Sequence, residues 1–502
     1  MATRRVLLLA YYVPPAGGPA VQRVLQFIQH LNVTGWTPEV LTVEEGAYPN
    51  CDPSLVNALP SSVPIHRTGA FDPLALYQKM NSGDGLPAGS LGDSSSFLEK
   101  AARWVRANVF IPDARVGWWP FAHVRGKQLL DTGRFDAILS SGAPHSVHLA
   151  GRSLAKATGL PWVADLHDPW TDISYYDDFP HTRWAKGLDQ RLEKNVLEDA
   201  TVVTTVSPSW VDLFRSKVPG TYGVVENGFD AQTFSLVHPG GPTRSEGSSL
   251  RATIAARAAV GYDPATPNSS TEDASGSGSG DAAPATAPAT APATAPATAS
   301  AAAEGREQDK DDAFVIAHVG KLYASRNPTA VWDAVASLQD EGAISNLVIR
   351  LIGTVDPTVM EAITRRGLED RVERVPFIPH DEAIREMAAS TLLLLVIEPF
   401  AQARGMITSK LYEYLASGRP LIGVGPPDGD ASALIAKHDA GRMVDWNDAR
   451  SARDMIREHY EAWDAGQPKD GAAWDPLQQH NREQQAFRMA DYLHAACVSG
   501  LE

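Results

Sequence analysis

The sequence predicts an α/β protein with two doubly wound, Rossmann-like parallel sheets. Three observations support this fold class. Short apolar runs of strand length alternate with segments of helical spacing, this alternation occurs twice in the 502 residues, and a low-complexity segment separates the two occurrences. Ligands of such sheets bind beyond the carboxyl ends of the strands. We therefore expect two domains that face each other across a cleft.

The expected elements follow this alternation from one end of the chain to the other. In the first half, apolar strands are expected at Val6–Ala10, Val40–Val43, Ala137–Ser140, Trp162–Asp165 and Val202–Val206, and helices at Val21–Leu31, His145–Thr158 and Ala185–Asp199. In the second half, the same criteria predict elements at Phe314–His318, Ala330–Gln339, Leu347–Ile352, Met360–Gly367, Leu392–Val396, Ser409–Ser417 and Leu421–Val424. A long, polar-rich amphipathic helix is expected at Leu477–Cys497.

Composition divides the chain further. Residues 262–310 consist largely of Ser, Gly, Ala, Pro and Thr, with Ala-Pro-Ala-Thr repeated between Ala283 and Thr298. Such a segment has too little apolar surface to offset its ordering entropy, so it predicts a disordered, partly polyproline-like spacer, either inert or used for docking. The expected parts are an N-terminal domain 1–235, a connection 236–261, the spacer 262–310, a C-terminal domain 311–473 and a C-terminal helix 474–502.

Charge and cysteine content exclude several classes of protein. The chain has 44 Lys and Arg against 60 Asp and Glu, a net charge of −16, which argues against nucleic acid as a main partner. Its two cysteines, Cys51 and Cys497, are too few for a disulfide framework and suit a reducing cytosol. The apolar runs are far shorter than the roughly 20 residues that span a bilayer. Arg4-Arg5 with Val6–Val13 resembles a weak signal peptide, but no small-residue cleavage site follows, so we interpret it as a first strand.

The turn after the first predicted strand contains Gly17 and Gly18 directly before a helix. Paired glycines let a backbone approach a ligand closely and expose N–H groups to an anion, although a simple tight turn would have the same pattern. The chain has neither the G-x-G-x-x-G motif nor the G-x-x-x-x-G-K-[ST] motif at this point.

Two further strand ends contain polar side chains. His167 and Asp168 follow the strand Trp162–Asp165, where they could hydrogen-bond sugar hydroxyls or a departing group. A histidine satisfied within the core is the alternative. Gly320, Lys321 and Arg326 follow the strand Phe314–His318, and two cations in such a loop suit a diphosphate, although surface cations are commonly only solvated.

The segment from Gly405 to Pro420 is the most informative. Thr408 or Ser409 can cap a helix, Gly418 can end it and Pro420 prevents its continuation. Glu413 then lies about one turn inside the helix, where a carboxylate can accept both hydroxyls of a ribose. Free N–H groups of residues 406–409 (Met406, Ile407, Thr408 and Ser409) would meet phosphate.

A second acidic pattern follows this helix. Asp428-Gly429-Asp430 is similar to the D-x-D sequence that holds a metal in some sugar transferases, but capping of the helix Ala431–Lys437 by Asp430 explains it better. No other cluster in the sequence has the spacing of a metal site.

Taken together and in order, these motifs resemble a family 4 (group 1) glycosyltransferase of the GT-B fold. The resemblance covers nearly the whole chain outside the spacer and also includes Val203–Ser207 with Glu226-Asn227-Gly228-Phe229-Asp230, and Gly320-Lys321-Leu322 with Arg326-Asn327. Ala143-Pro144-His145-Ser146, Ile111-Pro112-Asp113-Ala114 and Asp168-Pro169-Trp170-Thr171 are similar to the branch that assembles exopolysaccharide and lipopolysaccharide.

The resemblance implies a retaining transfer from a nucleotide-diphosphate sugar, which is a substrate and not a cofactor, to a glycan or lipid-linked acceptor, with no obligatory metal. The cysteine content and the short apolar runs predict a cytoplasmic protein, with peripheral contact at the inner face of the membrane left open. The N-terminal domain would be the acceptor side and the C-terminal domain would bind the nucleotide sugar. Gly17 and Gly18 would approach the donor phosphate and His167 the donor sugar. Lys321 and Arg326 would neutralise the diphosphate, while Glu413 holds the ribose.

The chain departs from the family at one position. The family's paired glutamates are separated by seven residues, but Gly405 stands eight positions before Glu413. Glu398 or the backbone of residues 405–408 would then replace the first glutamate. Two alternatives to a transferase stay open: a nucleotide-sugar epimerase of the same architecture, and a catalytically silent protein that binds nucleotide sugars.

An aromatic and basic stretch lies in the acceptor-side domain and comprises Arg103, Trp104, Arg106, Val109, Phe110, Arg115, Trp118 and Trp119. It could contact a lipid-linked acceptor or a membrane surface. Core packing of the tryptophans is the favoured interpretation.

Overall fold

The computed structural model describes residues 3–71 except 45, 47 and 49, residues 97–240 and residues 313–499. The predicted spacer and most of the predicted connection lie outside the described residues. Residues on both sides of this gap belong to one compact unit, Met1–Gly241 with Phe314–Glu502. The five predicted parts of the chain, with the four boundaries between them, remain predictions. We refer to the described residues before the gap as the N-terminal lobe and to residues 313–473 as the C-terminal lobe.

The N-terminal lobe contains a seven-stranded parallel sheet in the order β3-β2-β1-β4-β5-β6-β7. Its central strands are apolar on both faces because helices cover both, as expected for a parallel sheet. The strands are β1 Arg4–Leu9, β2 Trp36–Val43, β3 Ile65–Thr68, β4 Ala137–Gly142, β5 Trp162–Leu166, β6 Val202–Thr205 and β7 Tyr222–Val224.

Alternate residues of β1 face two different cores. Leu7 and Leu9 pack with residues of the helices α4 and α5, whereas Val6 and Leu8 pack with residues of α1. The helices of this lobe are α1 Pro19–His30, α3 Phe97–Asn108, α4 Trp119–Leu130, α5 Ser146–Thr158, α6 Arg183–Asp199, α7 Pro208–Lys217 and α8 Ala231–Ser235, with short 3-10 turns η1 Leu31–Thr34, η2 Pro53–Ala58, η3 Val116–Trp118 and η4 Trp170–Asp172.

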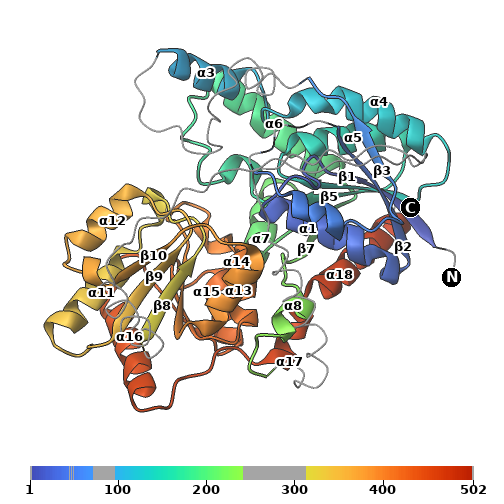
Figure 1. The fold of residues 1–502 in the computed structure, drawn as a ribbon. Helices are drawn as coiled ribbons and strands as arrows, with labels where there is room; N and C mark the ends of the chain where they lie inside the picture. The colour runs from blue at the N-terminus through green and yellow to red at the C-terminus, as the bar shows by residue number, and fades with distance from the viewer. Residues whose placement is uncertain are drawn as a thin grey trace, which may run out of the picture. The chain divides into compact units, whose positions relative to one another are not determined.

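The C-terminal lobe repeats the architecture with a six-stranded parallel sheet in the order β10-β9-β8-β11-β12-β13. The strands are β8 Phe314–Val319, β9 Leu347–Ile352, β10 Val372–Val375, β11 Leu392–Val396, β12 Leu421–Val424 and β13 Gly441–Val444. The helices are α11 Thr329–Asp340, α12 Pro357–Thr364, α13 His380–Ala389, α14 Ser409–Ala416, α15 Asp430–Lys437 and α16 Ala449–Asp464, with 3-10 turns η5 Ala324–Arg326, η6 Glu369–Arg371 and η7 Ala403–Gly405. Figure 1 shows α11 and α12 on one side of β8–β10 and α13–α15 on the other.

The last segment of the chain returns to the N-terminal lobe. It consists of α17 Trp474–Leu477, the turn η8 Gln478–His480 and α18 Arg482–Ser499, so the predicted single helix is interrupted before residue 482. Met489 and Leu493 of α18 are fully buried in the same core as Val6 and Phe27, and α18 lies beside α1 (Figure 1). The C-terminal helix is therefore an integral part of the N-terminal lobe.

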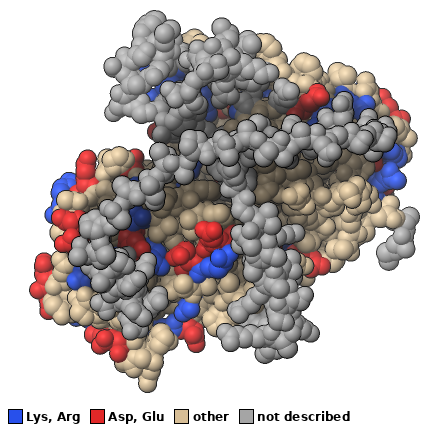
Figure 2. Space-filling model, viewed as in Figure 1, with Lys and Arg blue, Asp and Glu red and all other residues tan. Residues whose placement is uncertain are grey.

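Acidic and basic side chains are mixed on the surface. On the face drawn in Figure 2, Lys and Arg lie next to Asp and Glu in the described residues. The visible charge on this face is therefore not separated by sign.

Candidate active site

The glycine turn leads into α1. Gly18 is the N-cap residue of α1 and has φ +106°, a conformation that side chains disfavour, so the glycine is required for the chain to enter this helix. The Gly17 N–H donates to the Asn50 carbonyl at 3.0 Å. This corrects the expectation that Gly17 offers a free N–H group to an anion, because the amide is already used within the lobe.

His167 lies at the carboxyl end of β5, as predicted, and is linked to the sheet behind it. Its Nε2 lies 2.9 Å from Ser141 Oγ and 3.2 Å from Asp165 Oδ2. Because the Ser141 hydroxyl donates its proton to Asp165, Ser141 Oγ must accept from Nε2–H of His167. The Nδ1 atom of a neutral His167 is therefore an acceptor. Asp168 follows, and burial raises the pKa of its carboxyl group against the lowering effect of His167 and Arg23.

A buried ion pair fixes this strand end to α1. Arg23 donates to both carboxylate oxygens of Asp165, at 2.9 and 2.7 Å, and both side chains are almost fully buried. Burial raises the pKa of Asp165. The charge of Arg23 and the hydrogen bond from His167 outweigh burial and hold this pKa well below its usual range. Arg23 also reaches the Asn227 side chain, whose amide lies 3.5 Å from the Ile407 carbonyl in the C-terminal lobe. These contacts join the end of β5 to the 405–408 loop.

In the C-terminal lobe, Gly320, Lys321 and Arg326 follow β8 as predicted. Gly320 has φ +114°, and a Cβ atom there would overlap the Nζ and Cε atoms of Lys410. Lys321 is exposed. Arg326 Nε lies 3.4 Å from Glu398 Oε2, so Arg326 already has an anionic partner.

Glu398 connects the two lobes. Its carboxylate accepts from Ser174 of the N-terminal lobe at 2.5 Å and from Ser325 at 3.0 Å. Burial raises the pKa of Glu398, but these hydroxyls and Arg326 outweigh it, and the pKa is lowered. Glu398 is therefore an ionised side chain that holds Arg326 and Ser174 at the carboxyl end of β11. Its predicted contact with a donor sugar remains a prediction.

The loop before α14 differs in detail from the expectation. The Met406 N–H donates to the Ala403 carbonyl at 3.0 Å, so it is not one of the free groups predicted for residues 406–409. Thr408 is the N-cap residue, but its side chain makes no capping bond, and its Oγ1 is buried with no hydrogen-bond partner among the described residues. The helix ends as predicted, with Gly418 at φ +71°.

Glu413 lies in α14 beside three basic side chains. Its Oε1 lies 3.0 Å from His380 Nε2, and Arg482 and Lys410 add positive charge. Burial raises the pKa of Glu413, but His380, Arg482 and Lys410 together lower it. The hydrogen bond to Glu413 in turn raises the pKa of His380 against the effect of burial. Arg482, whose charge acts on Glu413, donates from Nη1 to the Gln22 side chain of α1 at 3.1 Å.

Gly405 has a packing explanation. A Cβ atom at this position would overlap the indole of Trp210, which belongs to α7 of the N-terminal lobe and is 1% exposed. The Trp210 Nε1–H also donates to the Gln402 carbonyl at 3.2 Å. The side chain that the family places at position 405 is thus replaced here by a tryptophan from another part of the chain.

The Asp428-Gly429-Asp430 sequence contacts protein groups. Asp430 is the first residue of α15 and does not cap it, which corrects the prediction. Its carboxylate accepts from the Ser209 N–H at 2.8 Å and the Ser209 hydroxyl at 2.9 Å, at the start of α7. Asp428 forms an exposed ion pair with Arg404. Within the described part of the chain, no three His, Cys, Asp or Glu side chains are grouped as metal ligands.

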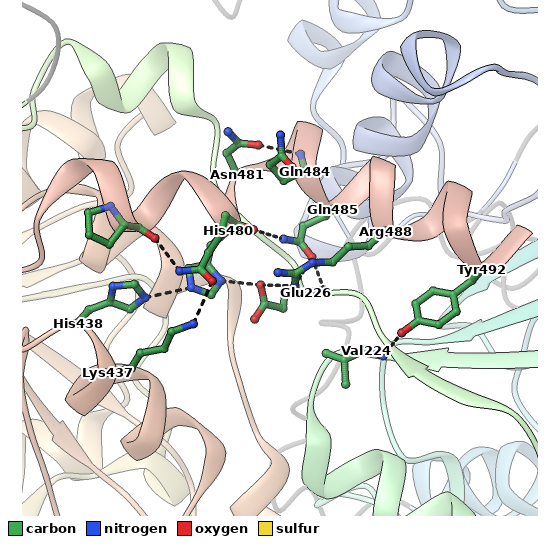
Figure 3. Close-up of polar contacts among 12 residues, drawn as sticks. Val224, Glu226, Lys437, His438, His480, Asn481, Gln484, Gln485, Arg488 and Tyr492 are labelled. Carbon is green, nitrogen blue, oxygen red and sulfur yellow. Dashed lines mark hydrogen bonds and ion pairs between the residues drawn. The ribbon is translucent and has the colours of Figure 1, made fainter. Parts of the chain in front are cut away.

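A buried polar cluster joins the C-terminal segment to both lobes. His480 lies between His438, the C-cap residue of α15, at 3.0 Å, and Glu226 after β7, at 2.6 Å (Figure 3). Arg488 of α18 also contacts Glu226, at 3.1 Å. Burial and His480 lower the pKa of His438 to about 4. The cluster fixes the point at which the chain crosses from one lobe to the other.

The aromatic stretch of the N-terminal lobe is only partly in the core. Trp118 is fully buried, but Trp104 and Val109 are 48% and 59% exposed and Trp119 is 37% exposed. The favoured interpretation, core packing of the tryptophans, is therefore wrong for Trp104 and Trp119.

The comparison with known families gives a match in the N-terminal lobe. Residues 17–228 match the model of the glycosyl transferase 4-like domain. The match confirms the resemblance for this part of the chain. A search of curated protein sequences finds no match.

Solved structures extend the fold assignment beyond the glycosyl transferase 4-like domain. Anabaena HepE, solved with UDP, is 15% identical with a TM-score of 0.56, and the match covers 98% of this chain and 100% of HepE. Sucrose-phosphate synthase from Thermosynechococcus elongatus is 14% identical (TM-score 0.53; coverage 99% and 97%). The lipopolysaccharide outer core galactosyltransferase WaaB is 12% identical (TM-score 0.52; coverage 97% and 99%). The predicted fold is confirmed: the chain has the GT-B fold.

Sequence reasoning missed three residues at this site. Trp210 fills position 405, Arg23 neutralises Asp165, and Lys410 lies against Gly320. Lys410 lies in the same helix as Glu413, three residues before it, and therefore on nearly the same face. This spacing could have revealed Lys410 as a site residue. Among the residues that the structure describes, no helix is long and apolar enough to cross a membrane.

Proposed function

We propose that the protein transfers a sugar, with retention of configuration, from a nucleotide-diphosphate sugar to a glycan or lipid-linked acceptor in surface polysaccharide synthesis. In this reaction the bond between the anomeric carbon and the phosphate oxygen breaks, and its electron pair goes to the leaving nucleoside diphosphate. The acceptor hydroxyl forms the new bond to the same carbon, and its proton passes to the leaving phosphate.

The observation that carries the proposal is the position of Glu413. It is an ionised carboxylate in α14 of the second sheet, bonded to His380 and acted on by the charge of Arg482, which donates to Gln22 of α1 in the N-terminal lobe. A carboxylate at this edge can accept the two hydroxyls of a ribose, while the amino end of α14 attracts the diphosphate. The HepE complexes contain UDP and UDP-glucose, which makes uridine diphosphate sugars the first donors to test.

Other residues would act on the sugar and the leaving group. His167 presents an acceptor atom, Nδ1, because Nε2–H is held by Ser141 and Asp165, and a sugar hydroxyl can donate to it. Arg326 and Lys321 would stabilise charge on the departing diphosphate. Binding of the diphosphate would then compete with Glu398 for Arg326.

The test is incubation of the protein with UDP-, GDP-, ADP- and dTDP-sugars, with and without glycan acceptors. A transferase releases nucleoside diphosphate and forms a product whose anomeric configuration, read by proton NMR, equals that of the donor. An inverted product contradicts retention. A new sugar isomer without acceptor indicates an epimerase, and binding without any product indicates a silent protein.

A further inference from the structure

Lys410 lies at the carboxyl end of β8, packed against backbone. It is the second residue of α14, and its Nζ and Cε atoms occupy the space where Gly320 would have a side chain. Burial, with the charge of Arg326, lowers the pKa of the Lys410 ammonium to about 8, while Glu413 opposes this effect. At neutral pH the group is therefore still a cation, and its side chain is only partly exposed.

No protein group in the described residues compensates this cation directly. No described residue accepts a hydrogen bond from Lys410 Nζ, and Glu413, the acidic group that influences it, is bonded to His380. Arg326 adds a second positive charge nearby. A partly desolvated ammonium with no hydrogen bond to a described residue is suited to an anion bound beside it in the working protein.

The start of the same helix is also suited to an anion. Thr408 occupies the N-cap position of α14 without a capping bond, so its side chain leaves the first N–H groups of the helix uncapped. The positive end of the helix dipole and the Lys410 ammonium lie in the same turn. Lys321 and Arg326, the two cations predicted to bind the diphosphate, are less suited to an anion. Lys321 is exposed to water, and Arg326 is already paired with Glu398.

We propose that Lys410 binds the diphosphate of the donor and is the main cation that stabilises charge on the leaving group. The inference rests on the proposed function and assigns to Lys410 the role expected for Lys321. When the glycosidic bond breaks, the negative charge that builds up on the phosphate oxygen would be met by the Lys410 ammonium. The ligand class is therefore a pyrophosphate-containing anion, whatever its base or sugar.

The experiment measures binding of inorganic pyrophosphate and of UDP by calorimetry, from pH 6.5 to 9.5, for the full-length protein and for Lys410→Met. Lys469→Met is the matched control, because Lys469 is an exposed C-terminal-lobe lysine paired only with Glu458. We expect Lys410→Met to weaken pyrophosphate binding about 10- to 100-fold at pH 7, as for loss of a charge-assisted contact, and the control to leave it unchanged.

The pH profile excludes a merely structural role. Wild-type affinity should fall relative to Lys410→Met as pH rises through about 8, while both proteins meet the same ionisation of the ligand. If Lys410→Met fails to fold, Lys410→Gln is used in its place. Equal pyrophosphate affinities and parallel pH profiles for wild type and Lys410→Met would overturn the role of Lys410 and leave the proposed function standing. If wild type binds neither pyrophosphate nor any nucleotide sugar, the proposed function itself fails.

Discussion

The indole of Trp210 occupies the space into which a side chain at Gly405 would project. These residues are far apart in sequence and belong to different lobes, yet Trp210 is 1% exposed and also bonded to Gln402. A side chain at position 405 and the Trp210 indole in its present place therefore exclude each other.

This relationship predicts that Gly405→Glu destabilises the protein. The new side chain has no room beside Trp210, and overpacking of this kind typically costs about 1–3 kcal/mol. Urea unfolding followed by circular dichroism would measure the change. In a Trp210→Ala background the same substitution should cost less, because the space is then open. Equal penalties in both backgrounds would show that Trp210 is not the obstacle.

A second prediction concerns the stability cost of Lys410. Its folded-state pKa of about 8 lies below the unfolded value of 10.5, so the unfolded chain binds more protons between these pH values. The full cost, up to about 3 kcal/mol, is present below pH 8 and is relieved as pH rises toward 10.5. Lys410→Met should thus unfold at higher urea concentration than wild type at pH 7, and the gap should narrow by pH 10. A variant less stable than wild type at pH 7 would contradict this.

A third prediction concerns the pair of Glu413 and His380. In wild type the His380 imidazole should titrate above 6.5, because Glu413 favours its charged form, and any stability from the pair is present below 6.5 and lost as pH rises through the raised pKa. In Glu413→Gln the His380 pKa should fall. Proton–nitrogen NMR of the histidine side chains would follow it, with His123 as a distant reference.

The same variant tests nucleotide binding. Loss of the charged acceptor for the ribose hydroxyls should weaken the binding free energy of UDP by about 1–3 kcal/mol without unfolding the chain. Unchanged calorimetric affinity would remove Glu413 from the site.

The fourth prediction concerns neutralisation of the leaving group. Arg326→Ala should lower turnover roughly 10²–10³-fold, which is typical for one lost electrostatic donor, and should weaken donor binding much less. Turnover should survive EDTA, and Asp428→Asn should change it little because Asp428 is paired with Arg404 at the surface. Activity abolished by EDTA and by Asp428→Asn, but retained in Arg326→Ala, would show that a metal takes this role.

The sequence predicted the sheet centres far better than their edges. The expected strands Leu347–Ile352, Leu392–Val396 and Leu421–Val424 coincide with β9, β11 and β12. The strands that were missed, β3, β7, β10 and β13, are the four edges of the two sheets. Edge strands here are short and partly exposed, so they lack the continuous apolar run by which a buried parallel strand is found.

Site residues were predictable where a single local motif, such as a strand end or a helix start, determines their position. Glu413 and His167 lie where helix spacing and strand ends placed them. The contacts of Trp210, Ser209 and Ser174 with the C-terminal lobe were not predictable, because each joins segments about 200 residues apart that share no local pattern. Even within one loop, hydrogen bonds such as that of Gly17 depend on a distant partner, Asn50.

The position of α18 has a consequence for biosynthesis. The apolar face formed by Val6, Leu8 and Phe27 is translated before the C-terminal lobe, yet Met489 and Leu493, which cover it, are translated after that lobe. The N-terminal lobe of a nascent chain thus exposes this apolar surface during the whole translation of the C-terminal lobe. Exposed apolar surfaces of this kind are bound by chaperones. A stop codon before residue 482 should therefore harm the first lobe more than the second, although the first lobe's own strands would all be present.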